Sequence, residues 1–168
     1  PAAERMGEAA EAATVPAGIA FNYRFLPAIQ YAKNLIDGGE LGEIHHFRGR
    51  YLQDWLVDPE AQWSWRNDAE MAGSGALGDL GAHTVDLARF LVGDVADVSG
   101  HLRTFVDERP VKGGEETRAV TVDDAYSAQV AFEDGTMGTL EASRFANGHK
   151  NDHTIEIDGA KGSLRFSL

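Results

Sequence analysis

Hydrophobic positions in the first third of the chain follow a helical period and then a strand period. Apolar residues recur at intervals of three and four between Ala28 and Ile36, which predicts a helix there. Pro27 stands where a helix can begin, and two glycines follow the end of the run. Residues Ile44 to Leu52 place Phe47 and Tyr51 on one side and Arg48 and Arg50 on the other, a pattern typical of a strand.

Short alternating runs dominate the second half of the chain and predict strands joined by tight turns. The candidate strands cover residues 95–106, 126–132 and 136–145, followed by two more near 155 and 164. Asp134-Gly135 predicts a two-residue hairpin between the second and third of them. The helices precede these strands rather than alternating with them. This order predicts an α+β fold, with a mostly antiparallel, open-faced sheet and helices packed on one face.

A second helix is predicted from Asp79 to Val92, directly after a glycine-rich run. Asp79, His83 and Asp86 fall on one face of it, because each residue of a helix turns the chain by about 100°. The leucines of the same helix lie roughly 80° to 120° away from Asp79. The face with the acid and the imidazole is therefore not the centre of the core-facing side.

A carboxylate beside a titratable base at a helix start is suited to moving protons on a bound substrate. The alternative interpretation is that Asp79 caps the helix and His83 is a packed core histidine. Spacing alone leaves both open, although the position of the leucines weakens the second.

The glycine run Gly73-Ser-Gly75-Ala-Leu-Gly78 satisfies the G-x-G-x-x-G pattern of dinucleotide-binding turns. Such a turn needs a buried strand immediately before it. The preceding residues, 66–72, are largely polar and contain no β-branched side chain. We therefore interpret the glycines as a close approach of the backbone to substrate or cofactor, or as loop flexibility.

Composition and charge narrow the class of protein. The chain has 168 residues, no cysteine and a formal net charge of −12, which argues against binding to nucleic acid or to an acidic membrane surface. It has no run of transmembrane length and no signal-like segment, so we expect a soluble, cytoplasmic protein.

His149 and His153 lie four apart without a third ligand, so we interpret them as a surface pair and expect no metal site. The acidic residues in 115–124 are interpreted as a solvated loop.

The first residues look like the end of another unit. Residues 1–13 are rich in alanine and glutamate and predict a helix, and Ile19-Ala-Phe21 predicts a short strand. A helix that leads into a strand here is typical of the last part of an α/β unit. We expect the chain to be a fragment that lacks the residues before it.

Several short motifs, in this order and spacing, resemble the C-terminal domain of the glucose–fructose oxidoreductase / inositol dehydrogenase (Gfo/Idh/MocA) family. Each motif is weak alone, but the order is specific. They include Phe21-Asn-Tyr-Arg24, Leu35-Ile-Asp-Gly-Gly, Trp63-Ser-Trp-Arg66, Gly75-Ala-Leu-Gly-Asp-Leu-Gly-Ala-His83 and Asp158-Gly-Ala-Lys-Gly-Ser-Leu164.

The resemblance implies an oxidoreductase with an N-terminal Rossmann domain for NAD or NADP and a C-terminal sheet domain for a sugar or polyol. Residues 1–21 would then be the end of the Rossmann domain, and residues 22–168 the C-terminal domain, truncated at its C-terminus. The chain contains neither the family's Glu-Lys-Pro motif, which carries a catalytic lysine, nor a Rossmann fingerprint. We therefore expect no cofactor binding and no turnover by the fragment alone.

By motif, the other two members of the family's catalytic set fall on Asp79 and His83. The implied reaction is hydride transfer between nicotinamide and a carbon that bears a hydroxyl, with His83 as general acid/base and Asp79 orienting the hydroxyl. Arg24, Trp65 and Arg66 resemble positions on the nicotinamide and substrate side of the cleft. Solvated arginines and a buried indole are the alternative interpretation of these three.

The resemblance also implies a homo-oligomer, because relatives commonly pair through the sheet. The outward positions of the strand at 125–131 are small and weakly polar, which favours a partner contact over free surface. A non-catalytic sugar-binding module and an assembly domain remain the alternative functions. The matched acid and imidazole favour the enzyme.

Overall fold

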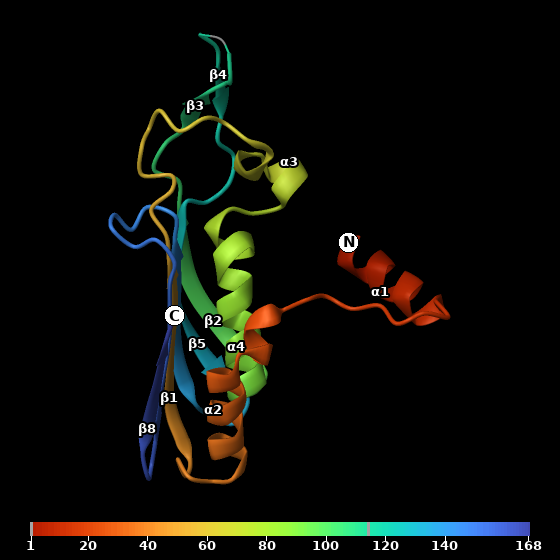
Figure 1. The fold of residues 1–168 in the computed structure, drawn as a ribbon, viewed down its shortest axis with the longest axis vertical. Coiled ribbons are helices and arrows are strands. Elements are labelled where there is room, and N and C mark those ends of the chain that lie inside the picture. The colour runs from red at the N-terminus through yellow and green to blue at the C-terminus, as the bar shows by residue number, and fades with distance from the viewer. Residues whose placement is uncertain (1, 114) are drawn as a thin grey trace.

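A six-stranded sheet extends along the molecule, and two helices lie on one of its faces (Figure 1). The computed structural model describes residues 2–113 and 115–168. Across the sheet the strands are β2 (Val95–Arg103), β5 (Ala125–Phe132), β6 (Met137–Ser143), β1 (Ile44–Leu52), β7 (Asp152–Gly159) and β8 (Ser163–Ser167).

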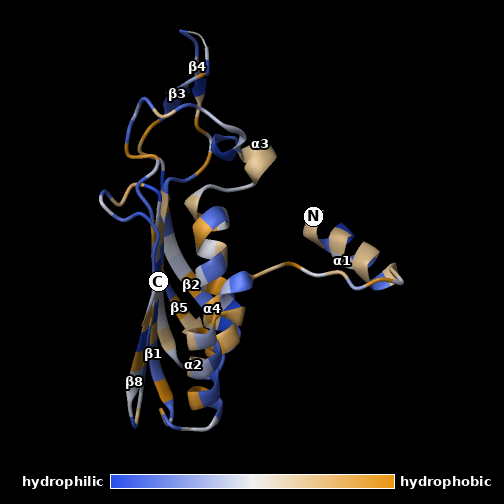
Figure 2. Ribbon diagram, in the orientation of Figure 1, coloured by the Kyte–Doolittle hydropathy of each residue, from blue (hydrophilic) through white to orange (hydrophobic). Residues whose placement is uncertain are grey.

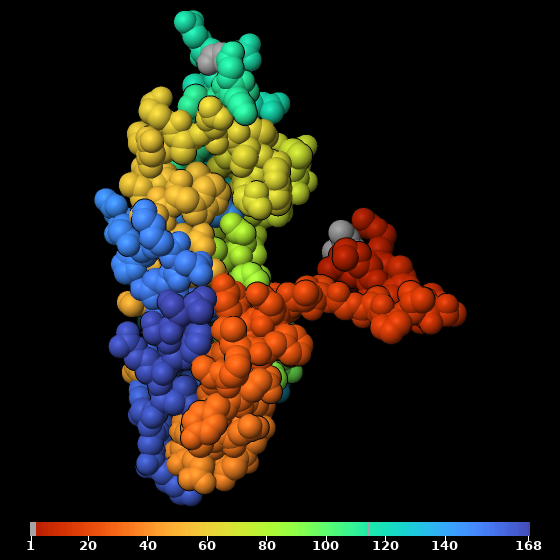
Figure 3. All heavy atoms as spheres, viewed as in Figure 1, coloured from red at the N-terminus to blue at the C-terminus, as the bar shows by residue number. Residues whose placement is uncertain are grey.

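The two covering helices are α2 (Pro27–Asp37) and α4 (Ala82–Leu91). A 3-10 turn, η1 (Asn22–Phe25), precedes α2, and a π-helical turn, η3 (Leu77–Gly81), leads directly into α4. Beyond one end of the sheet lie η2 (Trp65–Asn67), α3 (Ala69–Ala72) and the small pair β3 (Glu108–Pro110) and β4 (Thr117–Ala119). The first helix, α1 (Ala2–Ala12), stands apart from the sheet on an extended segment (Figures 1 and 3).

The sheet is mixed: four of its five neighbouring strand pairs are antiparallel, as expected, and one is parallel, which corrects the expected fold class. β1 lies between β6 and β7, parallel to β6 and antiparallel to β7; Phe47, for example, faces Gly138 on one side and Ile157 on the other. A parallel pair needs a long crossover between its strands. The chain between β1 and β6, which includes α4, β2 and β5, provides it. Hydrophobic alternation records neither the direction of a strand nor its partner, so the sequence pattern could not reveal this pair.

Most individual elements lie where periodicity predicts them. The predicted strand at Ile44–Leu52 is β1, and the predicted helix near Ala28–Ile36 is α2. A hairpin at Asp134-Gly135 joins β5 to β6, with a left-handed φ of 91° at Gly135, but its loop is longer than the predicted two residues, because the N–H of Phe132 donates to the carbonyl of Thr136 (2.9 Å). Residues 19–21 pair with no strand of the described chain, so a strand there, as the end of a preceding unit, stays a prediction.

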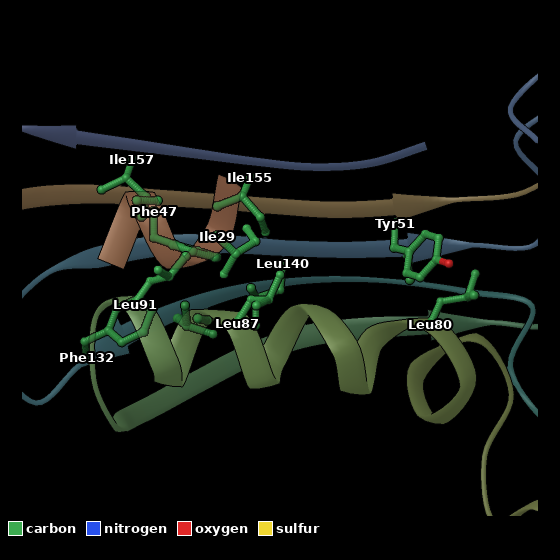
Figure 4. Close-up of a cluster of buried hydrophobic side chains, with 14 of the residues drawn as sticks. Ile29, Phe47, Tyr51, Leu80, Leu87, Leu91, Phe132, Leu140, Ile155 and Ile157 are labelled. Atoms are coloured by element: carbon green, nitrogen blue, oxygen red, sulfur yellow. The ribbon is translucent and has the colours of Figure 1, made fainter. Parts of the chain in front are cut away.

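The hydrophobic core lies between the inner face of the sheet and the two helices (Figure 4). Both helices intersperse hydrophobic with hydrophilic positions, as amphipathic helices require (Figure 2). Each large aliphatic side chain buried here contributes about 1.5–3 kcal/mol. The fully buried members include Ile29, Phe47, Leu87, Ile155 and Ile157. None of the helices among the described residues is long and apolar enough to cross a membrane.

Candidate functional site

An open cleft of about 410 Å³ lies at the N-terminal end of α4, where η3 meets the ends of β1 and η2. It brings Asp79 and His83 together, and Arg66 lies in its wall as well. The full lining consists of Tyr51, Gln53, Trp55, Arg66, Asp79, Leu80 and His83.

Asp123 fixes the start of the helix that carries this pair. Its carboxylate accepts hydrogen bonds from the backbone N–H groups of Gly75 (2.7 Å) and Leu77 (2.8 Å), and its carbonyl accepts one from Ala76 (3.0 Å). These bonds satisfy N–H groups that have no partner within the helix. The cap is therefore supplied from a distant loop, and the interpretation of Asp79 as the capping residue is wrong. The side chain of Asp79 is left for the cleft.

The glycines before and within this turn allow close packing against the chain itself. A Cβ on Gly75 would lie 1.7 Å from the carbonyl oxygen of Asp123, and one on Gly81 would lie 2.5 Å from the ring of Tyr126. Both distances are far below van der Waals contact. For Gly75 the expectation of a role toward substrate, cofactor or flexibility is corrected, because its small size lets the start of η3 sit directly on the loop that carries Asp123, whereas Gly73 has open space around it and a left-handed φ of 79°.

The carboxylate of Asp79 rests on a buried arginine. Its Oδ2 accepts a hydrogen bond from Nη2 of Arg144 at 3.0 Å. The Asp79 side chain is 36% exposed, whereas that of Arg144 is 1% exposed. One carboxylate oxygen is therefore held from beneath the cleft, while the group itself stays accessible to a ligand.

His83 is half-buried among aromatic rings. Its ring centroid lies 5.0 Å from that of Tyr23, 6.0 Å from that of Phe21 and 6.2 Å from that of Tyr51. Burial lowers the pKa of His83, although the charges of Asp79 and Asp86 partly oppose the shift. The imidazole is thus favoured in its neutral, proton-accepting form near pH 7. Its place in the cleft wall does not fit a packed core histidine.

A directional hydrogen-bond chain borders the imidazole. The hydroxyls of Tyr23 and Tyr51 are 2.7 Å apart, and the amide oxygen of Asn151 accepts from Tyr51 (2.7 Å) and from Gln53 (2.8 Å). Because Tyr51 gives its only proton to Asn151, its oxygen must accept the proton of Tyr23. Burial raises the pKa of Tyr51, so its hydroxyl stays protonated. These bonds fix the orientation of the Tyr51 ring beside the imidazole.

His153 supports this wall from inside the core. Its ring is fully buried and stacks on Tyr51 with the centroids 4.5 Å apart, and its Nε2 lies 3.3 Å from the hydroxyl oxygen of Thr84. Burial lowers the pKa of His153 to about 4, so it is neutral at pH 7. The interpretation of His149 and His153 as a surface pair is wrong for His153. Its alternation with Ile155 was the signal that it points inward.

Of the three residues predicted to bind substrate, only Arg66 lines the cleft of this chain. Its guanidinium carbon lies 4.4 Å from the ring centroid of the half-exposed Trp65, which is not itself a lining residue. Arg24 is outside the lining. Its Nε and Nη2 donate to the two carboxylate oxygens of Asp86 at 2.7 and 2.5 Å, which ties η1 to α4. Arg24 is therefore more than a solvated arginine, and its predicted place on the cofactor side of the cleft stays a prediction.

Sequence reasoning missed Tyr51, Gln53, Trp55 and Arg144 as parts of the site. It also interpreted the acidic stretch that ends at residue 124 as solvated. Glu115 and Glu116 are exposed as expected, but Asp123 and Asp124 are buried, and Asp124 accepts a hydrogen bond from the backbone N–H of Phe105 at 2.8 Å. In the part of the chain that the structure describes, no group of three or more histidine, aspartate or glutamate side chains is placed to hold a metal ion.

A family model and two curated relatives match this chain over most of its length. The family described as GFO/IDH/MocA C-terminal domain matches residues 29–165. The chain is 44% identical over 161 residues to levoglucosan dehydrogenase of Pseudarthrobacter phenanthrenivorans, a match that covers 89% of this chain and 41% of that protein. It is 30% identical over 147 residues to scyllo-inositol 2-dehydrogenase (NAD(+)) of Bacillus subtilis, covering 87% of this chain and 38% of that protein.

Among solved structures, the chain is similar to levoglucosan dehydrogenase in complex with NADH and L-sorbose. The TM-score is 0.94 at 42% sequence identity, and the match covers 98% of this chain and 43% of that one. The chain thus spans less than half the length of the relatives it matches.

Proposed function

This chain belongs to the GFO/IDH/MocA C-terminal domain family, and we propose that it is the substrate-binding and catalytic part of a longer NAD- or NADP-dependent dehydrogenase. The substrate is a sugar or polyol, oxidised or reduced at a CH–OH group. The observation that carries the proposal is the cleft in which Asp79 and His83 lie together. The names of the relatives, a levoglucosan dehydrogenase and an inositol dehydrogenase, support the reaction class.

The two side chains divide the proton chemistry of alcohol oxidation. As the carbinol carbon loses a hydride, its hydroxyl must lose a proton. His83, kept neutral by burial, accepts that proton, and the Asp79 carboxylate accepts a hydrogen bond from a neighbouring hydroxyl of the substrate, which orients the reacting group. NAD or NADP, when bound, supplies the hydride acceptor. The acid–base pair fits this cofactor, because hydride transfer from an alcohol leaves a proton for a protein group to take.

The cofactor belongs, in this proposal, to an N-terminal Rossmann domain whose last part is residues 1–21, with residues 22–168 as the C-terminal domain. The separation of α1 from the sheet supports this division (Figure 3). Exposed apolar side chains along the same segment, Met6, Val15 and Ile19, support it as well, because a preceding domain would cover them. Turnover would then require both domains.

Single substitutions in the longer protein test the proposal. Asp79→Ala and His83→Ala should each lower kcat by about two to four orders of magnitude, the range typical of acid–base groups. The affinity for the dinucleotide should change little, because its contacts lie mostly outside this chain. Steady-state kinetics with a panel of sugars and polyols measures kcat, and fluorescence titration measures cofactor binding.

His101→Ala is the matched control, because His101 is exposed on β2 and outside the cleft. It should retain parental turnover. Near-normal turnover of both Asp79→Ala and His83→Ala would overturn the proposal and favour a non-catalytic sugar-binding or oligomerisation module.

A further inference from the structure

Arg144 is a buried arginine that lies directly beneath the cleft. It follows the last residue of β6 and continues the inward register of Gly138, Leu140 and Ala142. Its own backbone is fixed on both sides. The N–H donates to the carbonyl of Asp124 (3.0 Å), and the carbonyl accepts from the N–H of Leu56 (3.2 Å). The guanidinium therefore extends from a rigid point of the sheet.

This single guanidinium contacts three residues of the cleft wall. Nη2 donates to Oδ2 of Asp79 at 3.0 Å, and Nη1 donates to the carbonyl of Arg66 at 3.4 Å. Its central carbon lies 5.4 Å from the ring centroid of Trp55. The three partners come from η3, from η2 and from the loop after β1. Segments that are distant in sequence thus meet on one buried side chain.

The chemistry of these contacts requires arginine rather than any cation. A planar guanidinium presents five donors in a fixed fork and can stack on an aromatic ring, whereas a lysine ammonium is a compact point charge. A buried charge also destabilises a fold unless it is paired. Here the pairing partner is the half-exposed carboxylate of the cleft.

A second buried arginine shows what a purely structural role looks like. The guanidinium of Arg109 donates to the backbone carbonyls of Leu56, Asp58 and Ala61, at 2.7, 2.9 and 3.3 Å. It ties a loop together and touches no residue of the cleft lining. Arg144 differs because its charged contact is with Asp79.

We propose that Arg144 is a positioning residue that aims the Asp79 carboxylate at a substrate hydroxyl next to the reacting one, an inference that rests on the proposed function. Holding Oδ2 from below leaves the other carboxylate oxygen to receive the hydroxyl. It also removes the rotational freedom that the carboxylate would otherwise lose when substrate binds. Through Arg66 and Trp55, the same guanidinium fixes two further parts of the wall at a constant distance from that carboxylate.

Kinetics of the longer protein with Arg144→Lys and Arg144→Met test this role. Both variants should lower kcat, by about 10-fold for lysine and about 100-fold for methionine, because misplacing a reacting group has effects of this size. The KM for the dinucleotide should stay within about twofold. Thermal melting gives the folded fraction, to which each kcat is normalised. Arg109→Lys is the matched control, which should lower the melting temperature but leave the normalised kcat at the parental value.

A double-mutant cycle distinguishes positioning of Asp79 from a general structural effect. Arg144→Lys should lower kcat in the parent but change it by less than about twofold in an Asp79→Asn background, because the carboxylate that Arg144 holds is then gone. An equal loss in both backgrounds, or no loss in either, would overturn the role of Arg144. Parental turnover of Asp79→Asn alone would instead overturn the proposed function, so the two failures are distinguishable.

Discussion

The buried imidazole of His153 is the residue at which protonation and folding are most directly coupled. It is fully buried against Tyr51, and its pKa is about 4, whereas an unfolded histidine titrates near 6.5. Between these two values the unfolded chain binds the proton and the folded chain does not. Stability is therefore complete above about pH 6.5 and falls as the pH decreases toward 4.

Replacement of His153 by Gln should flatten this dependence. In the parent, the titration of His153 lowers the free energy of unfolding by on the order of 3 kcal/mol as the pH falls from 6.5 to 4. Glutamine does not titrate, so this decrease should be absent from the variant. Urea denaturation at a series of pH values measures it. Equal slopes for His153→Gln and the parent would contradict the prediction.

At the scale of elements, the start of the η3–α4 helix depends on contacts from outside the helix. Asp123 supplies the cap from the loop before β5, and Gly81 lies against Tyr126 of β5. The helix that carries Asp79 and His83 is thus positioned by the sheet rather than by its own first turn. A π-helical turn at this point is consistent with that view, since such turns occur frequently at functional sites.

Gly75→Ala should lower the free energy of unfolding by about 2–4 kcal/mol, because the new Cβ would collide with backbone atoms of Asp123 that cannot move independently. Chemical denaturation measures the change. Gly162→Ala is the matched control: its Cβ would meet nothing within 4 Å, so the change should stay below about 1 kcal/mol. A Gly75→Ala chain as stable as the control would show that the close packing at the helix start is not required.

At the scale of the whole molecule, one face of the sheet is covered by helices and the other carries none among the described residues. The uncovered face is small and polar on β5, as expected, at Ser127 and Gln129. However, it carries charged side chains on β1, β7 and β8, so the weakly polar character found on β5 does not extend across the face. Several of these form cross-strand pairs, such as Arg48 with Asp158 at 2.5 Å. A hollow of about 340 Å³ lies over the middle of this face.

We propose that this face joins two copies of the chain, in agreement with the expected homo-oligomer. Sedimentation at micromolar concentration should then give a mass above the 18.2 kDa of one chain. Thr139→Lys, which places a charge at the centre of the face, should shift the population to monomer. Tyr31→Lys on α2, which packs on the other side of the sheet, should leave the mass unchanged. A parental chain that sediments as a clean monomer would contradict the proposal.

The sequence by itself determined the features that arise within one element. The 3.6-residue period placed α2, the alternation placed β1, and the four-residue spacing put Asp79 and His83 on one face of a helix, because these periods follow from local backbone geometry. The family motifs likewise identified the pair as the candidate acid and base. Only the tertiary structure decided the parallel pairing of β1 with β6, the Asp123 cap, the stacking of His153 on Tyr51 and the contact of Arg144 with Asp79. Each of these joins residues that are far apart along the chain, and their meeting depends on the order of strands in the sheet and on which buried polar groups must find a partner. Neither condition is recorded in local periodicity.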